Sequence, residues 1–384
     1  RIASETKPLV ISRAMGTTNV DSSRFKDSMS ITDWQPFQYL EQHGSKGKVT
    51  PAFYTKGLKE QDKGDETTLG VTPKLMEYWK RYSPQLFVTA SHATQFNLEM
   101  PFGKGLIVSG KNRFYALDKK QFREFTTFLR GVLFNGKEDD LLSFLNRIKA
   151  PVIETRPVPA VWVAAGNCLI GDAKKTKNSM AVTALSRYGF NQLVGYTVPS
   201  WYGKGGWGTL GLLFSNHDAS SLAEAWYLNN QFILDETMTR FPKLMDVHFN
   251  SPDINGIKND PDFARGMNSA GYGMGKDQLG LIHDRDTVAF YGDPAWTARL
   301  DESRAPSPWN DPADASKGFT VTANKDAKGR LGVWFPNRIN ADKATVTIGG
   351  TATPIEKAGL LTNDFLLLRE LELKKGEKAV VEME

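Results

Sequence analysis

The chain of 384 residues is long enough for one large and one small domain, and its 40% hydrophobic and 11% aromatic content is that of a folded globular protein. Its formal net charge of +5 is modest, and its lysines are scattered rather than set among aromatic residues, so we expect no nucleic-acid partner. No apolar run is long enough to span a bilayer, and a single cysteine excludes an internal disulfide.

The first ninety residues alternate between strand-like and helix-like patterns. In chain order they predict a strand over 7–13, a long polar loop to residue 30, a helix from residue 32, a strand over 48–54, a loop over 56–70 and a helix over 72–82. This alternation is typical of an α/β fold with a mostly parallel sheet.

Two short apolar runs end in side chains with catalytic chemistry. The run over 86–90 leads to His92, and the run over 161–165 leads through a Gly-Asn pair to Cys168. The carboxyl ends of parallel strands lie at the edge of a sheet where ligands bind. A lone cysteine is more often a small buried residue than a nucleophile, but a histidine at the end of a second strand favours a thiol nucleophile paired with an imidazole.

The segment between His92 and Cys168 is longer than one crossover needs and indicates inserted structure. It predicts a hairpin over 105–117 and helices over 119–134 and 139–148. After Cys168 the pattern predicts a helix over 179–188, a strand over 192–197, a glycine- and aromatic-rich loop over 199–208, a long helical stretch over 210–241, and a strand with a turn over 288–294.

The composition changes after residue 303. Residues 304–317 are rich in Pro, Ser, Asp and Ala and predict a linker. Beyond them, a small immunoglobulin-like β-sandwich is predicted by five short strand-like runs over 319–323, 331–335, 344–348, 364–368 and 379–382. We therefore expect a catalytic domain over 1–303 and a C-terminal domain over 318–384.

The two strand ends at His92 and Cys168, together with Val-Ala-Phe-Tyr-Gly-Asp-Pro over 288–294, resemble the caspase, legumain, clostripain and gingipain group of cysteine peptidases, in particular its gingipain-like branch. The resemblance runs from Pro8 to Trp296 and consists of short motifs. It implies a caspase-like three-layer α/β/α domain with a mostly parallel sheet. It also implies a cysteine endopeptidase that acts on protein or peptide substrates.

The resemblance assigns catalytic roles to particular residues. Cys168 attacks the scissile carbonyl, His92 protonates the leaving amine, and the backbone N–H groups of Ala93 and Cys168 stabilise the oxyanion. Asp65 and Glu66 are candidates for an acid that orients His92.

Other residues are expected to bind substrate. Gly166 and Asn167 allow the backbone to approach the substrate closely. In the resembled family, the segment after the strand next to the cysteine lines the pocket for the side chain before the cleaved bond. Here that segment supplies Trp201, Tyr202 and Trp207.

One departure from the family supports an alternative function. The chain has His92-Ala93 where the family usually shows His-Gly. The alternative is a catalytically inactive caspase-fold protein that serves in binding or adhesion.

No metal or cofactor is expected, with calcium as the one alternative. Asp253, Asp260 and Asp262 are calcium candidates, but no acidic residue closes their loop at the EF-hand distance. Because the first residue is Arg1 rather than Met, we expect that a preceding segment has been removed. We expect the protein to be secreted or to lie in the cell envelope, in the periplasm or at the surface.

Overall fold

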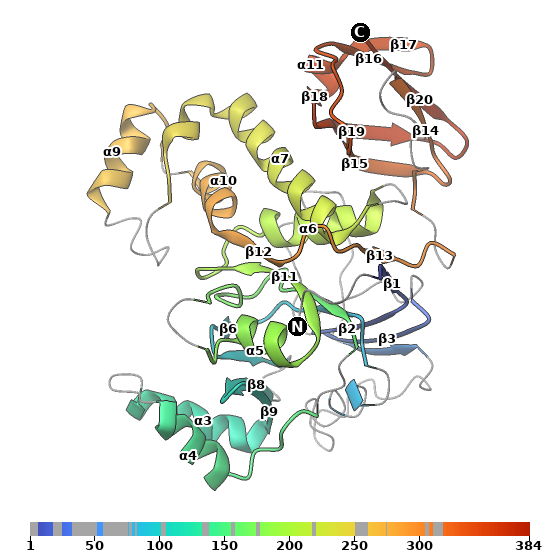
Figure 1. Ribbon diagram of the computed structural model, residues 1–384. Coiled ribbons are helices and arrows are strands. Elements are labelled where there is room, and N and C mark those ends of the chain that lie inside the picture. Colours follow the sequence, from blue (N-terminus) through green and yellow to red (C-terminus); the bar gives the residue numbers. More distant parts are fainter. Residues whose placement is uncertain are drawn as a thin grey trace.

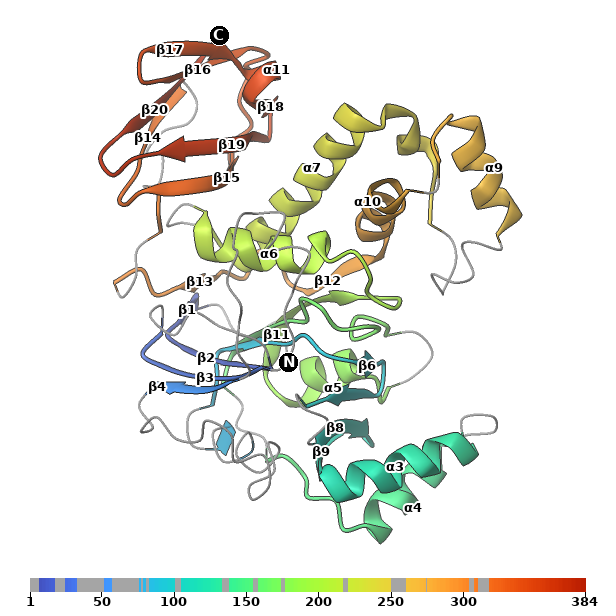
Figure 2. The same cartoon turned by 180° about the vertical axis from the view of Figure 1, so that it is seen from behind.

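The computed structural model of the chain describes residues 7–17, 25–32, 52–56, 76, 79–80, 83–100, 105–132, 138–154, 158–173, 177–216, 220–249, 260–273, 275–303, 307–309 and 318–384. These residues form an α/β domain with an inserted small sheet, and a C-terminal unit of two antiparallel sheets (Figure 1 and Figure 2). None of the described helices is both long and apolar enough to cross a membrane.

A seven-stranded sheet forms the centre of the α/β domain. Its strands are, in spatial order, β12 (Val288–Gly292), β11 (Phe190–Tyr196), β10 (Ala160–Val163), β5 (Leu86–Val88), β2 (Arg13–Gly16), β3 (Asp27–Thr32) and β4 (Ala52–Lys56). The inner strands from β11 to β3 are parallel, and each outer strand is antiparallel to its neighbour. The predicted mixed α/β fold with a mostly parallel sheet is confirmed. If the five parallel strands are counted by their place in the sequence, β2 is the first, followed by β3, β5, β10 and β11. Their spatial order is then second, first, third, fourth and fifth, as in a doubly wound sheet, and the direction of this order reverses between β2 and β5.

The N-terminal strands differ from the prediction. β2 runs to Gly16 and β3 begins at Asp27, so the loop expected up to residue 30 is wrong at both ends. β3 is rich in Ser, Thr and Asp and lacks the apolar run from which a buried strand is predicted. β4 overlaps the strand expected over 48–54. The structure describes only residue 32 of the helix expected from that position and only residue 56 of the loop expected over 56–70. The other residues of both lie outside the described part of the chain.

Helices cover both faces of the central sheet and produce three layers (Figure 1). Successive side chains of β10 point to opposite faces, as in any strand. Val161 and Val163 pack on one face with α6 (Lys204–Ser215) and α7 (Leu222–Arg240). On the other face, Trp162 packs with α5 (Met180–Arg187).

The helical stretch expected over 210–241 is two helices rather than one. α6 ends at Ser215, and α7 begins after Ser221. The Ser221 side chain accepts from the Glu224 N–H and the Glu224 side chain accepts from the Ser221 N–H, which is a capping box that fixes this helix start.

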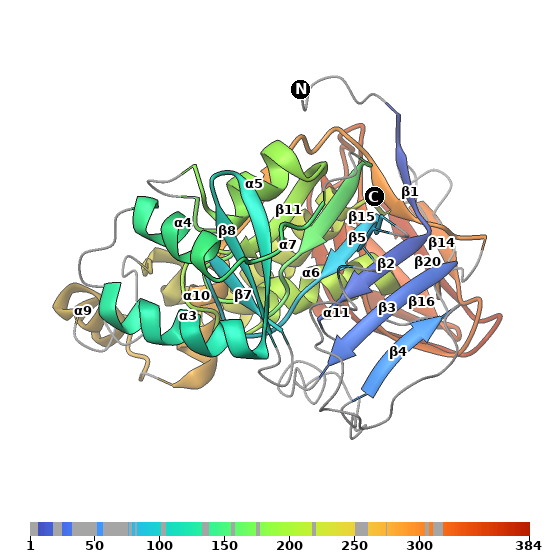
Figure 3. The same ribbon diagram turned by 90° about the horizontal axis from the view of Figure 1, so that it is seen from below.

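The insertion between His92 and Cys168 is a second, antiparallel sheet with two helices on its outer face (Figure 3). Its elements are β6 (Ala93–Thr94), β7 (Asn97–Glu99), β8 (Gly105–Gly110), β9 (Arg113–Asp118), α3 (Lys119–Val132) and α4 (Glu138–Arg147). Lys111 and Asn112 both have positive φ, as the two-residue turn of a hairpin requires. The predicted hairpin and both predicted helices are confirmed. Phe125 and Phe144 pack against Val108 between the helices and the sheet.

A further group of helices lies beside the carboxyl end of β11. It consists of η4 (Pro242–Asp246), α9 (Pro261–Ser269) and α10 (Lys276–Thr287), and α10 leads directly into β12. Ile282 of α10 packs in one apolar cluster with Val198, Val247 and Phe249. Outside the central sheet, β1 (Leu9–Ile11) pairs in parallel with β13 (Ala298–Leu300).

The C-terminal unit consists of two antiparallel sheets that share one core. Their strands are β14 (Gly318–Thr322), β20 (Lys378–Met383), β16 (Ala344–Ile348) and β17 (Thr351–Pro354) in one sheet, and β15 (Ala327–Trp334), β19 (Phe365–Leu373) and β18 (Gly359–Leu361) in the other. The short helix α11 (Ile355–Ala358) joins β17 to β18. The five predicted strands are present, and β17 and β18 were not predicted. The immunoglobulin-like assignment stays a prediction.

The C-terminal unit packs against α6 and α7 through β15 and β19 (Figure 2). Phe365 and Leu367 belong to the same core as α7. The Asn216 side chain donates to the Gly332 carbonyl at 2.9 Å and accepts from its N–H at 3.0 Å. Of the expected linker over 304–317, only 307–309 are described, and Trp309 lies in the C-terminal core. The domain boundaries stay predictions.

Candidate active site

β5 and β10 are neighbouring parallel strands, and the loops that follow them leave the sheet side by side. The pairing continues past the strand ends, because the Thr89 N–H donates to the Val163 carbonyl at 3.0 Å and the Gly166 N–H donates to the Thr89 carbonyl at 3.3 Å. The loops that lead to His92 and Cys168 therefore lie at one carboxyl edge, as the sequence predicted. This edge adjoins the point between β2 and β5 where the strand order reverses.

Asn167 and Ser91, the residues directly before Cys168 and His92, are hydrogen bonded. Asn167 is fully buried, and its Nδ2 donates to the Ser91 carbonyl at 2.9 Å and to the Ser91 Oγ at 3.1 Å. The Ser91 Oγ donates in turn to the Glu99 carbonyl at 2.7 Å. Breaking these bonds would leave buried polar groups unpaired, so they fix how far apart the two loops lie.

Cys168 is partly buried and lies against Ser200. Its Sγ is 3.6 Å from the Ser200 Oγ and 3.9 Å from the Ser200 carbonyl oxygen, and the Ser200 Oγ donates to the Gly166 carbonyl at 3.0 Å. The next residue, Leu169, has a φ of 58°, in the left-handed region that residues other than glycine rarely adopt. Such strain costs on the order of 1–3 kcal/mol and persists only where packing enforces it, commonly at functional turns. A hydrogen bond holds this turn in place, because the Leu169 N–H donates to the Val198 carbonyl at 3.1 Å.

His92 is exposed at the start of the β6–β7 hairpin, and its carbonyl accepts from the Glu99 N–H at 2.9 Å. Within the described part of the chain, no hydrogen bond joins the His92 ring to the Cys168 Sγ. The two loops place these residues at the same edge of the sheet. Hydrogen bonds between catalytic groups often close only when substrate binds.

The backbone at Ala93 is compatible with an alanine. Its φ is not positive, so the position does not require the glycine that the resembled family usually has. Because His92 and Glu99 form a hydrogen-bonded pair, the next pair, Ala93 and Leu98, is a non-hydrogen-bonded pair of the antiparallel ladder. The Ala93 N–H is therefore directed away from β7.

The glycine- and aromatic-rich loop is shorter than the sequence predicted. α6 begins at Lys204, directly after Gly203 with its φ of 93°, so the predicted loop is wrong over 204–208. The glycines there serve close packing rather than a loop, because a Cβ on Gly206 would collide with the Ala165 carbonyl.

The three aromatic residues of this segment lie in different surroundings. Trp201 is 36% exposed and is the one that reaches the surface. Tyr202 is buried, and its hydroxyl donates to the Asp277 Oδ1 at 2.9 Å. Trp207 is buried in the core between α6 and the central sheet, so its predicted place in a pocket wall is wrong. Gly166 and Asn167 are also buried, where they hold the turn before Cys168, and their contact with substrate stays a prediction.

The structure adds three residues that the sequence analysis did not select. Ser200 contacts the Cys168 Sγ, as described above. His283 and Asp284 of α10 are completely buried, and His283 binds the Pro199 carbonyl next to Ser200. The adjacent His-Asp pair is visible in the sequence, but nothing there indicates that this face of α10 is turned inward.

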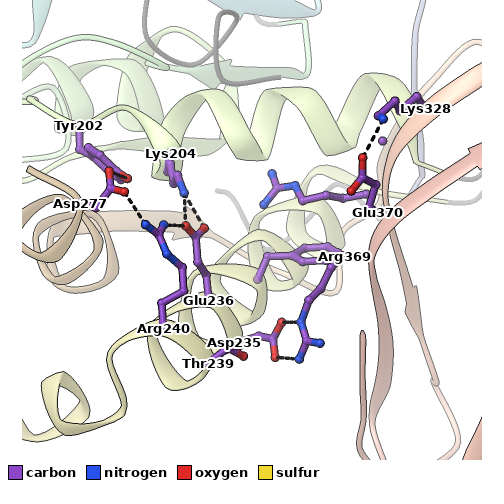
Figure 4. A pocket seen from close by; sticks show the side chains of 13 residues that line it. Tyr202, Lys204, Asp235, Glu236, Thr239, Arg240, Asp277, Lys328, Arg369 and Glu370 are labelled. Carbon is purple, nitrogen blue, oxygen red and sulfur yellow. Dashed lines mark hydrogen bonds and ion pairs between the residues drawn. The ribbon is translucent and has the colours of Figure 1, made fainter. Parts of the chain in front are cut away.

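A cavity of about 770 Å³ lies between α7, α10, β15 and β19 (Figure 4). Its charged side chains pair with one another: Lys204 with Glu236 at 2.5 Å, and Arg240 with Glu236 and with Asp277 at 2.6 Å each. Burial alone would raise the pKa of Glu236, but Lys204 and Arg240 hold that pKa below its usual value. Burial and the bond to Asp277 raise the pKa of Tyr202. Cys168 does not line this cavity, and Tyr202 connects it to the loop beside Cys168.

The predicted acid and metal residues are only partly described. Asp65, Glu66 and Asp253 lie outside the described residues. Asp260 caps α9 by accepting from two backbone N–H groups, and Asp262 pairs with Arg265. In the described segments, no three His, Cys, Asp or Glu side chains gather as metal ligands would.

No family model and no curated protein sequence matches the chain. Among solved structures, the chain is similar to the Arg-specific cysteine proteinase gingipain R, with a TM-score of 0.31 and 11% identity over 97% of this chain and 61% of that chain. It is also similar to the complex of the pro- and mature domains of RgpB from Porphyromonas gingivalis, with a TM-score of 0.26 and 13% identity over 82% of this chain and 51% of that chain. The likeness is distant and concerns the fold alone. We therefore base the assignment of the site on its own residues.

Proposed function

We propose that the chain is a cysteine endopeptidase that hydrolyses peptide bonds through Cys168 and His92. The observation that carries the proposal is the pair of loops tied together by Asn167 and Ser91 at one edge of a doubly wound sheet. The loops carry the single thiol of the chain and an exposed imidazole, at the edge where such sheets bind ligands.

The proposed reaction has two stages. His92 takes the thiol proton of Cys168, and the thiolate attacks the carbonyl carbon of the scissile bond. His92 then gives that proton to the leaving amine, which leaves an acyl-enzyme. Water hydrolyses the acyl-enzyme, releases the carboxylic acid and restores the thiol.

Two backbone amides are suited to stabilise the oxyanion that forms during the attack. The Cys168 N–H makes no hydrogen bond to any group in the described part of the chain. The Ala93 N–H is directed away from its ladder partner. Donors that face the developing charge and are already oriented contribute strongly to acyl transfer.

One observation favours a second function, that of a catalytically inactive binding protein. Among the described residues, the hydrogen-bond partners of the Cys168 Sγ are the two oxygens of Ser200, and the His92 ring is not one of them. A protein of this kind would bind peptides at the same edge without cleaving them.

Hydrolysis of a positional-scanning peptide library distinguishes the two functions. The parent protein should cleave peptides, and Cys168→Ala and His92→Ala should each lower turnover by at least about a hundredfold, because each removes a group used in every cycle. His248→Ala removes another exposed imidazole, with a side chain 65% exposed, and should leave turnover unchanged. Peptide binding without cleavage by the parent protein, or near-parental turnover of Cys168→Ala, would contradict the endopeptidase.

A further inference from the structure

His283 lies in the middle of α10 with both ring nitrogens bonded. Its Nδ1 is 2.8 Å from the Asp284 Oδ1, and its Nε2 is 3.1 Å from the Pro199 carbonyl oxygen. A carbonyl oxygen only accepts hydrogen bonds, so the Nε2 carries a proton and donates it to Pro199. The His283 ring is completely buried, so losing this bond would leave a buried polar group unpaired.

Aromatic rings surround the His283 ring on several sides. Tyr196, at the end of β11, stacks on it with centroids 5.8 Å apart. Trp201 meets it edge-on at 6.3 Å, and Phe249 does so at 5.1 Å. The imidazole therefore contacts the residue that precedes the loop over 197–203 and the most exposed residue within that loop.

Asp284 holds the far end of the same loop. Its Oδ2 accepts from the Gly205 N–H at 2.8 Å, in the first turn of α6, and from the Tyr196 hydroxyl at 3.2 Å. The positive N-terminal end of the α6 dipole also stabilises a carboxylate at this place. The His283–Asp284 pair thus fixes the start, the middle and the end of the loop over 197–203.

This loop is the one that touches the proposed nucleophile. Ser200 follows Pro199 directly, and its hydroxyl lies 3.6 Å from the Cys168 Sγ. Trp201 comes next and is 36% exposed. A shift of the Pro199 carbonyl would therefore move the neighbour of the thiol and the exposed aromatic surface together.

We propose that His283 is a positioning residue, which holds Ser200 against Cys168 and Trp201 at the site edge and so determines which side chain is accepted before the cleaved bond. The inference about selectivity rests on the proposed peptidase function. The inference about the position of the loop does not, since it concerns contacts of the resting protein.

Two substitutions separate the two bonds of the imidazole. The amide nitrogen of glutamine reaches the place of Nε2, and that of asparagine reaches the place of Nδ1. His283→Gln keeps the bond to Pro199, whereas His283→Asn keeps only the bond to Asp284. Thermal unfolding of both variants checks that each is folded.

The first readout is the rate at which iodoacetamide alkylates Cys168, the only cysteine of the chain. We expect His283→Asn to react about fivefold faster than the parent, the equivalent of one lost hydrogen bond, and His283→Gln to react at the parental rate. This rate is measurable whether or not the protein cleaves peptides, so it tests the positioning role even if the peptidase proposal fails.

The second readout is kcat/KM on a peptide series that differs only before the cleaved bond. His283→Asn should change the ratios between peptides, and His283→Gln should restore them. Equal alkylation rates and equal ratios in the two variants would overturn the proposal. Loss of folded structure in both variants would also overturn it, by making His283 an ordinary core residue.

Discussion

Asn167 and Ser91 are 76 residues apart in the sequence, yet one buried amide group joins them through two hydrogen bonds of 2.9 and 3.1 Å. These bonds cross from the loop of the proposed nucleophile to the loop of the proposed base. The relative position of these two loops therefore depends on the buried side chain of Asn167.

Asn167→Ala should lower kcat/KM for peptides by about tenfold to a hundredfold, because small misplacements of reacting groups are costly. Asn178→Ala is the matched control. Asn178 is also buried, and its Oδ1 accepts from the Asn112 N–H at 3.1 Å. Both variants should lose about 1–3 kcal/mol of stability through the lost bonds. Equal activity losses in both variants would show that Asn167 acts only through stability.

Trp201→Ala should alter the preference for the side chain before the cleaved bond, because Trp201 is the exposed aromatic residue of the loop beside Cys168. Trp207→Phe is the control, since Trp207 lies in the core of the sheet and should affect stability but not preference. The measurement is kcat/KM over peptides that differ at this one position. A uniform slowing of all peptides by Trp201→Ala would exclude a role in selectivity.

The common edge that carries His92 and Cys168 could be predicted because both residues follow clear strands. Leu86–Val88 and Ala160–Val163 are apolar and buried on both faces, and such runs are recognisable without a structure. The parallel pairing of the two strands then brings His92 and Cys168 to one edge.

The rest of the site could not be predicted for physical reasons. The run of glycines at the start of α6 is typical of a loop in sequence. In the structure these positions are helical, and they are glycine because Ala165, Val288 and Asn229 leave no room for a side chain. α10 buries His283 and Asp284 beside Leu281 and Ile282. Apolar residues therefore do not recur at helical spacing along its inward face, and the sequence pattern does not reveal that face. A polar residue on an inward face is recognisable only once its partners are known.

Glu236→Gln should lower the free energy of unfolding at about pH 7, and the loss should shrink towards about pH 3. Lys204 and Arg240 hold the pKa of Glu236 below its usual value of 4.5, against the burial that would raise it. A carboxyl with a lower pKa in the folded state stabilises that state above its unfolded pKa, and this contribution is lost as the pH falls through its folded pKa.

Glu370→Gln is the control for this pH dependence. Glu370 lines the same cavity and pairs with Lys328, but its side chain is 68% exposed, so solvent screens the pair and little change is expected. Denaturant titrations of the parent and both variants at the two pH values give the comparison. A constant loss for Glu236→Gln at both pH values would contradict the assigned cause.

Limited proteolysis should cut the chain first within 304–317, the predicted linker. The fragments should stay associated, because Asp235 accepts from Arg369 at 2.6 and 2.7 Å and Tyr227 packs edge-on against Trp334. Size-exclusion chromatography of the cut protein measures this association. A first cut within Val288–Gly292 would contradict the boundary, since that strand belongs to the central sheet.

Covalent labelling of Cys168 by a peptidyl acyloxymethyl ketone tests the central claim most directly. The reagent needs a thiolate, an oxyanion site and a bound peptide at the same place. The account predicts saturable labelling of one thiol per chain, slowed at least about a hundredfold by His92→Gln, while the rate with iodoacetamide changes far less. Labelling that does not saturate and that proceeds equally fast in both proteins would contradict a peptidase built on Cys168 and His92.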